Sequence, residues 1–142
     1  MKSCVVIYNP NSGHTLKTKH LKEYKIILEK HGYSARFIGT EYRGHAKEII
    51  SHLDKCDLVI SMGGDGTFNE AVTGNLQRKD RLVLAHIPVG TTNDVGVMFG
   101  YGKDIKRNLS LLLNGVIKEM DICIINGQPF VYVAGFGKFM HI

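Results

Sequence analysis

Residues 58–72 read LVISMGGDGTFNEAV, and this stretch decides which fold the rest of the sequence can adopt. Its opening residues form a short apolar run of the kind that lies buried in a sheet. Three glycines in four positions follow, and Phe68, Ala71 and Val72 then have the spacing of a buried helix face that starts at about Thr67. The stretch therefore predicts a strand, a glycine-rich loop and a helix in direct succession.

The same alternation of strand and helix extends in both directions from this stretch. Apolar runs over residues 3–8, 34–38 and 82–87 indicate three further strands. Helical spacing of apolar residues indicates three further helices: Leu21, Tyr24 and Leu28 within residues 16–31; Ala46, Ile49, Ile50 and Leu53; and Ile105, Leu109, Leu112 and Leu113. This alternation predicts an α/β fold of three layers, in which helices cover both faces of a parallel sheet.

The pattern changes after the last predicted helix. Two β-rich runs, residues 120–125 and 129–134, flank an Asn-Gly dipeptide at 126–127, which tolerates the positive φ of a tight turn. We therefore expect the chain to end in an antiparallel β-hairpin that begins a second, β-rich domain. The predicted division is an α/β domain over residues 1–118 and the start of a truncated β-rich domain over residues 119–142.

The charge of the chain is unevenly placed. Its 142 residues include 18 Lys and Arg against 13 Asp and Glu, a formal net charge of +5. Five lysines gather around one predicted helix: Lys17, Lys19, Lys22, Lys25 and Lys30. A solvated helix face explains this run, and attraction to a polyphosphate or an anionic membrane surface is the alternative. No aromatic residues alternate with the lysines as stacking platforms, so a nucleic-acid partner is not expected.

The cysteines and the apolar runs indicate a cytoplasmic protein. Cys4, Cys56 and Cys123 are odd in number, far apart and without metal-binding spacing, as is usual in a reducing compartment. No apolar run approaches the roughly 20 residues that a membrane-spanning helix needs. We therefore expect a soluble chain.

Three polar or glycine-rich loops follow predicted strands, at residues 9–13, 63–67 and 88–94. In an open α/β sheet, ligands bind at the edge formed by the carboxyl ends of the strands. The glycines of residues 63–67 lack Cβ atoms, which lets phosphate oxygens approach the backbone N–H groups at the start of the following helix. Asp65 in this loop favours the start of a helix, and it is also a candidate to hold Mg2+ through a bound water molecule.

The other two loops allow both a structural and a functional interpretation. The small polar residues of 9–13 dominate ordinary turns, yet they also present N–H groups and hydroxyls to an anion. In the third loop, Asn93 and Asp94 form a common helix-capping pair, while two hydroxyls, a carboxamide and a carboxylate lie within four positions. Taken together with the middle loop, the third loop favours a binding site, while the first loop leaves both interpretations open.

Several other sequence motifs for nucleotide or hydrolytic chemistry are absent. The sequence has no GxxxxGK[ST] P-loop, no GxGxxG after the first strand, no Gly-x-Ser-x-Gly elbow and no HExxH. These absences argue against P-loop ATPases, dinucleotide oxidoreductases and serine hydrolases. The histidines are interpreted as structural or surface residues: His14, His20, His31, His45, His52, His86 and His141.

In this order, NPNSG at residues 9–13, GGDGTFNE at 63–70 and PVGTTND at 88–94 resemble the diacylglycerol kinase catalytic domain family. This family includes bacterial lipid kinases and the sphingosine and ceramide kinases. The resemblance runs from Val5 to about Gly137. The Gly-Gly-Asp-Gly core also occurs in NAD kinases and phosphofructokinases, whereas the three motifs in this order are specific to the lipid kinases.

The resemblance implies which residues contact ligands. The first two motifs would hold the phosphates of ATP, and Thr40 and Thr91 would add further nucleotide contacts. The implied nucleotide-binding set is Asn9, Asn11, Ser12, Gly13, Thr40, Gly63, Gly64, Asp65, Gly66, Thr67, Asn69, Glu70, Gly90 and Thr91. The implied acidic network linked to Mg2+ comprises Asp65, Asp94 and Asp121. The general base of the family is expected beyond Ile142.

The sequence departs from the family pattern on the acceptor side. Residues 95–97 read Val-Gly-Val where many relatives have a Phe-Ala-Arg-like stretch, and Tyr132 stands where the family often has Asn. Residues 138–140 read Lys-Phe-Met where the family often places an Asp-Ala pair. These differences leave the ATP side of the resemblance intact.

The implied function is that of an ATP-dependent lipid kinase, which transfers the γ-phosphate of ATP to a lipid hydroxyl with the help of Mg2+. Its partners would be ATP and a lipid acceptor at the membrane surface, reached from the cytoplasm by peripheral binding, and homo-oligomer formation stays open. The chain would be the ATP-binding half and inactive alone. The alternatives are a soluble-substrate kinase resembling NAD kinase and a non-catalytic nucleotide-binding module.

Overall fold

The computed structural model describes residues 1–12, 16–89 and 104–114 with their side chains, and the backbone of four short strands beyond them. The main elements are β1 (Lys2–Tyr8), α1 (Thr18–Lys30), β2 (Tyr33–Gly39), α2 (His45–His52), β3 (Leu58–Gly63), α3 (Asp65–Leu76), β4 (Leu84–Pro88) and α5 (Ile105–Asn114). The short strands are β5 (Ile117–Lys118), β6 (Ile122–Ile125), β7 (Gln128–Val131) and β8 (Gly135–Phe136).

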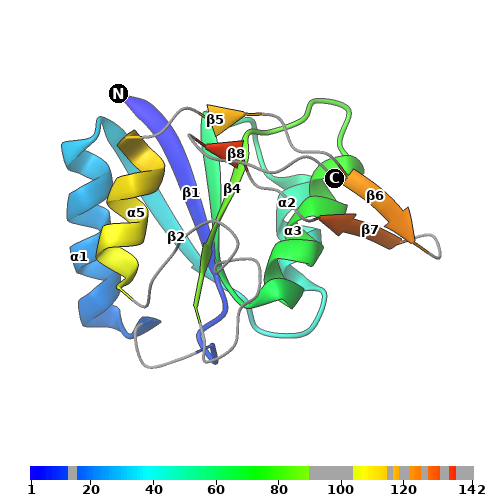
Figure 1. Cartoon of the computed structure of the whole chain (residues 1–142), viewed down its shortest axis with the longest axis horizontal. Coiled ribbons are helices and arrows are strands. Elements are labelled where there is room, and N and C mark those ends of the chain that lie inside the picture. Colours follow the sequence, from blue (N-terminus) through cyan, green and yellow to red (C-terminus); the bar gives the residue numbers. More distant parts are fainter. Residues whose placement is uncertain are drawn as a thin grey trace.

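The four long strands form one parallel sheet in the order β2-β1-β3-β4 (Figure 1). Parallel neighbours need a crossover connection, and α1, α2 and α3 supply these connections. Strand β3 lies between two neighbours and is buried along its whole length, so its sequence is a continuous run rather than an alternation. The predicted parallel sheet of an α/β fold is confirmed.

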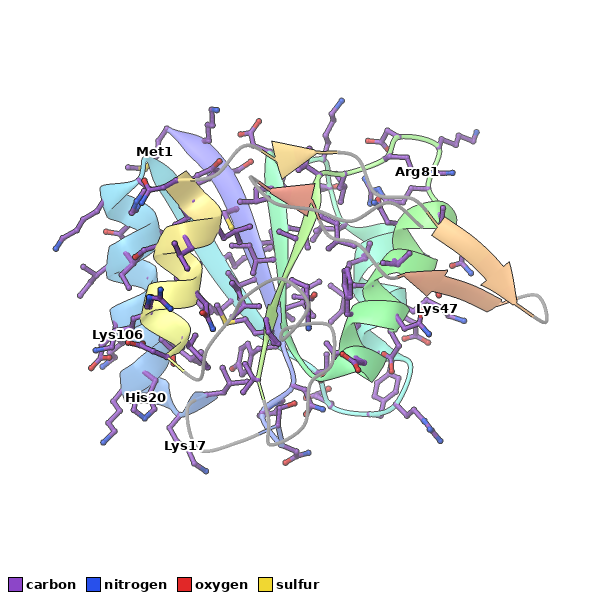
Figure 2. All side chains as sticks on the ribbon, in the orientation of Figure 1. Met1, Lys17, His20, Lys47, Arg81 and Lys106 are labelled. Carbon is purple, nitrogen blue, oxygen red and sulfur yellow. The ribbon has the colours of Figure 1, made fainter. Side chains whose placement is uncertain are left out.

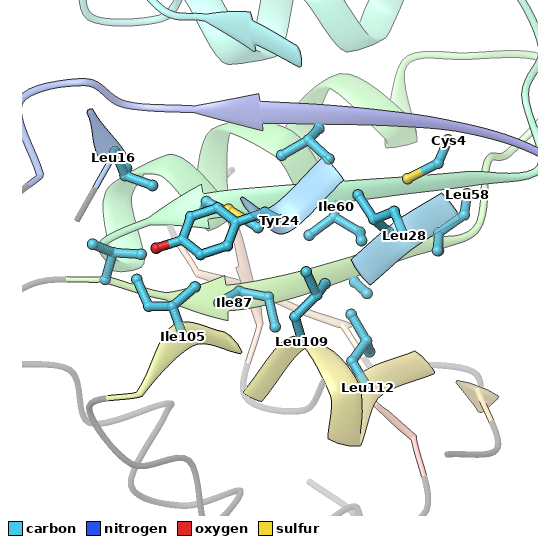
Figure 3. Packing of buried hydrophobic residues seen from close by; sticks show 14 residues of the cluster. Cys4, Leu16, Tyr24, Leu28, Leu58, Ile60, Ile87, Ile105, Leu109 and Leu112 are labelled. Carbon is cyan, nitrogen blue, oxygen red and sulfur yellow. The ribbon is translucent and has the colours of Figure 1, made fainter. Parts of the chain in front are cut away.

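Helices cover both faces of this sheet, as predicted. Helices α1 and α5 lie on one face, and α2 and α3 lie on the other (Figure 1). Figure 3 shows the first of these two cores, in which Tyr24 and Leu28 of α1 and Leu109 of α5 surround Ile60 and its neighbours in the sheet. Each face of the sheet therefore has its own apolar core, and the two cores together fix the strand ends.

The observed helix boundaries differ slightly from the predicted ones. Helix α3 begins at Asp65 rather than at about Thr67, because Gly64 has an extended backbone and acts as the N-cap. Helix α1 ends at Lys30, and Gly32 follows with a φ of 89°. This left-handed backbone favours glycine, so the expected helix stop at Gly32 is confirmed.

A close contact between α2 and α3 depends on Gly74, which the sequence analysis did not single out. A Cβ atom on Gly74 would lie 2.5 Å from the carbonyl oxygen of Lys47 and 3.2 Å from the Cβ of Ile50. The two helices therefore pack closer here than a side chain on Gly74 would allow. This packing holds α3, and with it the loop before α3, against the sheet.

The five lysines of the charge run are all exposed, as expected for a solvated helix face. Figure 2 shows Lys17 near one end of α1, pointing away from the sheet, and Lys106 of α5 beside the same helix. The Nζ atom of Lys106 lies 3.0 Å from a carboxylate oxygen of Glu23, an ion pair that joins α5 to α1 at the surface. Attraction of this face to an anionic partner stays a prediction.

Beyond α5, strand β6 pairs antiparallel with β7, and β5 pairs antiparallel with β8. The expected Asn-Gly turn at 126–127 lies outside the described residues, so the division of the chain at residue 118 and the start of a β-rich domain stay predictions. Among the helices that the structure describes, none is long and apolar enough to cross a membrane.

Candidate functional site

The strand register brings the first two sequence loops to one edge of the sheet. At the carboxyl ends of the strands, Tyr8 of β1 lies next to Gly39 of β2 and Met62 of β3, while Gly63 of β3 lies next to Pro88 of β4. The segments that follow β1, β2 and β3 therefore start side by side. Ligands bind at this edge of an open α/β sheet.

The loop after β1 is a turn organised by Asn9. The N–H of Asn9 donates to the carbonyl oxygen of Met62 at 3.1 Å, which ties the loop to β3. The side-chain Oδ1 of Asn9 accepts a hydrogen bond from the N–H of Asn11 at 2.9 Å. The main-chain carbonyl oxygen of Asn9 accepts a hydrogen bond from the N–H of Ser12 at 3.0 Å. Asn9 thus has a structural role, and it places Ser12 toward the glycine loop.

Ser12, Gly63 and Thr67 meet at the centre of the site. A Cβ atom on Gly63 would lie 2.7 Å from Oγ1 of Thr67 and 3.3 Å from Oγ of Ser12. The two hydroxyls therefore approach the same backbone from two different loops, and no larger residue fits at Gly63 without displacing them. The structure brings these three predicted residues together.

Gly64 and Gly66 are glycines for a different reason. Apart from adjoining residues and the backbone of α3 itself, no described atom lies within 4 Å of a Cβ built on either of them. Gly64 has a φ of −83°, which any residue adopts, so its backbone does not require glycine. The space above both residues adjoins the N-terminus of a twelve-residue helix, where the first N–H groups have no partner within the helix and the helix dipole favours an anion.

The remaining described candidates surround this loop. Asp65 is exposed in the first turn of α3, and Glu70 is half-buried one turn further on. The Oδ1 atom of Asn69 is buried and has no hydrogen-bond partner among the described residues. The N–H of Thr40 donates to the carbonyl oxygen of Tyr8 at 2.9 Å, which fixes Thr40 at the end of β2.

Five predicted residues lie outside the described part of the chain: Gly13, Gly90, Thr91, Asp94 and Asp121. The third loop and two members of the acidic network therefore stay predictions. Among the described residues, no group of three or more His, Cys, Asp and Glu side chains could hold a metal ion. Of the predicted acidic network, Asp65 is the member that lies in the described part, and its side chain is exposed. Mg2+ usually binds through one or two carboxylates together with phosphates and water.

A buried histidine, His86, lies beneath the loop. From the sequence, this residue was interpreted as structural or surface-exposed. His86 of β4 is 1% exposed, and its Nδ1 lies 2.7 Å from Oγ of the equally buried Ser61 of β3. The imidazole stacks on Phe68 of α3 with ring centroids 4.6 Å apart. Burial lowers the pKa of His86 to about 3, so the ring is neutral at ordinary pH. Neither the residue type nor its spacing identifies this cluster, because the three partners come from three different elements.

Fold and loop together define an open α/β protein whose glycine-rich loop lies at the carboxyl edge of a parallel sheet. A family model described as the diacylglycerol kinase catalytic domain matches residues 3–125, and the chain belongs to this family.

Curated proteins and solved structures agree with this assignment. The chain is 39% identical over 141 residues to a diacylglycerol kinase of Bacillus subtilis strain 168, covering 97% of this chain and 46% of that protein. It is 35% identical over 144 residues to a diacylglycerol kinase of Staphylococcus aureus strain NCTC 8325, covering 99% of this chain and 45% of that protein. The chain thus spans about half the length of the curated relatives that it matches.

The fold is also that of solved relatives. The structure matches one from Bacillus anthracis strain Sterne, provisionally assigned as a diacylglycerol kinase, with a TM-score of 0.80 and 29% identity. The match covers 91% of this chain and 47% of that one. A second structure, of a diacylglycerol kinase from the same strain, gives a TM-score of 0.73 at 28% identity and covers 91% of this chain and 48% of that one.

Proposed function

We propose that the loop from Gly63 to Thr67 binds the phosphates of ATP and that the chain is the nucleotide-binding half of a lipid kinase. The observation that carries this proposal is the space above Gly64 and Gly66. Neither backbone conformation nor any described neighbour requires glycine at these positions, whereas close approach of a phosphate to the backbone does. A loop built only for folding would gain stability from side chains there.

The chain's own groups fit a phosphate at this place. The first N–H groups of α3 lack helical partners, and the hydroxyls of Ser12 and Thr67 both lie close to Gly63. The unpartnered Oδ1 of Asn69 is available to a hydroxyl or to a water molecule. Asp65 would hold Mg2+ through water, and the ion would neutralise charge that develops on the phosphates.

Transfer to a lipid hydroxyl is the second part of the proposal and rests on the family to which the chain belongs. In phosphoryl transfer the protein positions the reactants, and a carboxylate takes the proton of the attacking hydroxyl. By the family pattern that carboxylate lies beyond Ile142, while Asp94 and Asp121 support the magnesium-linked network. The acceptor is a lipid at a membrane surface, which the protein reaches from the cytoplasm by peripheral binding.

A competition experiment on the full-length protein tests this function. The protein is given ATP and Mg2+ with diacylglycerol in mixed micelles and NAD as competing acceptors, and both phosphorylated products are quantified. We expect phosphate on the lipid alone. Phosphorylated NAD would identify a soluble-substrate kinase, and nucleotide binding without either product would identify a non-catalytic module.

A further inference from the structure

The cluster of Ser61, Phe68 and His86 joins strand β4 to the two elements that flank the glycine loop, β3 and α3. Ser61 lies two residues before Gly63 in β3, and Phe68 directly follows Thr67 in α3. His86 is paired with Ser61 in the register of β3 and β4. One imidazole ring therefore contacts the strand that enters the loop and the helix that leaves it.

The imidazole of His86 has two contacts, one with Ser61 and one with Phe68, and the first determines the geometry of the second. The bond of 2.7 Å between Nδ1 and Oγ of Ser61 sets the plane of the imidazole, and Phe68 stacks on that plane at an angle of 11°. The N–H of Phe68 donates to the carbonyl oxygen of Gly64 at 3.3 Å, the first such bond of the helix. A change in the ring plane would therefore move the first turn of α3, where the proposed phosphate contacts lie.

Core stability alone does not account for a histidine at this position. Among the described residues, Nε2 of His86 makes no hydrogen bond of ordinary geometry although the ring is fully buried, and the nearby backbones of Ser61 and Gly63 offset only part of the lowering of its pKa by burial. An unpartnered buried polar atom costs free energy, whereas an apolar ring of similar volume would fill the space without that cost. The polar contact instead gives the ring one fixed orientation, which an apolar ring lacks.

We propose that His86 is a positioning residue for nucleotide binding, which acts through Ser61 and Phe68 to orient the loop Gly63–Thr67. This inference rests on the proposed function of that loop. The residue touches no phosphate itself; it sets the direction of the N–H groups that do. Pre-organisation of this kind raises affinity because the cost of ordering the loop is met before the ligand binds.

The test compares His86→Phe with the parent chain. Phenylalanine keeps an aromatic ring of similar size beside Phe68 but removes the bond to Ser61 that sets the plane of the ring. The hydroxyl of Ser61 retains the carbonyl oxygen of Ala85 at 3.4 Å as an acceptor. We expect a melting temperature equal to or above that of the parent. The affinity for Mg-ATP should be about tenfold lower, because one hydrogen bond that pre-organises the loop is lost. A merely structural role would change stability and leave the affinity as it was.

One control and one further test variant complete the experiment. Leu84→Met changes the same strand and the same face two residues away, and it should leave the affinity for Mg-ATP unchanged. The milder Ser61→Ala removes the same bond from the other side, so it gives the answer if His86→Phe does not fold. Amide NMR signals of Gly64 and Gly66 should shift in both test variants and not in the control.

Different binding results would contradict the positioning role of His86 and the phosphate site itself. If the parent binds Mg-ATP, and His86→Phe and Ser61→Ala bind it equally well, His86 is a packing residue only and the glycine loop keeps its role. If the folded full-length parent does not bind Mg-ATP at all, the phosphate site itself is wrong and the positioning role falls with it.

Discussion

Glycines at neighbouring positions of one loop serve different physical needs. Gly63 is required by its protein neighbours, since the hydroxyls of Ser12 and Thr67 occupy the space of a side chain. Gly64 and Gly66 face space that no described neighbour fills. In the sequence motif these three glycines look equivalent. The structure distinguishes Gly63, which packing requires, from Gly64 and Gly66, which leave room for a ligand.

At the same scale, the neutral state of His86 predicts how stability depends on pH. Burial lowers its pKa from the ordinary value of 6.5 to about 3, so the unfolded chain binds a proton more readily than the folded chain below about pH 6.5. The stability contributed by the neutral ring is present above pH 6.5 and is lost as the pH falls toward 3. Between about pH 7.5 and about pH 5.5, the parent should lose about 1 kcal/mol more stability than His86→Phe.

Urea unfolding of both proteins at the two pH values measures this difference directly. The two proteins differ only at residue 86, so contributions from the rest of the chain cancel in the comparison. Equal losses of stability would show that His86 takes up its proton freely in the folded state.

Helix α3 is the element that joins the loop to the rest of the molecule. Gly66 near its start and Gly74 near its end are both helical, yet their surroundings are opposite, because a Cβ on Gly74 would collide with the backbone of Lys47. Gly74→Ala should therefore destabilise the protein by about 1–3 kcal/mol through overpacking. Thermal unfolding checks this, and a variant as stable as the parent would mean that α2 moves away at no cost.

The elements were largely predictable from sequence, since β1, β3 and β4 contain compact apolar runs and each long helix has a regular apolar stripe. The site was predictable only where a motif carries it, as in the loop from Gly63 to Thr67. The cluster of His86, Ser61 and Phe68 was not, because the contacts join residues 25 and 18 positions apart along the chain. Gly74 was missed for the same reason, since its need for glycine lies in the neighbouring helix.

The chain spans about half the length of the curated relatives that it matches. We expect residues 1–142 alone to bind nucleotide weakly and to transfer phosphate to lipid slowly or not at all, because the base and most of the lipid site lie in the other half by the family pattern. A single-turnover assay with diacylglycerol and ATP, run beside the full-length protein, measures this. Turnover by residues 1–142 at the rate of the longer protein would show that these residues suffice for catalysis.

The most direct test of the phosphate site is calorimetric titration of Mg-ATP into the parent and into Gly66→Ala. Alanine is the better helix former, and its methyl group meets no described neighbour, so the variant should gain up to about 1 kcal/mol of stability. The same methyl group enters the proposed phosphate space, and the affinity for Mg-ATP should fall by at least about tenfold. A variant that is more stable and binds Mg-ATP as tightly as the parent would contradict a phosphate site at this loop.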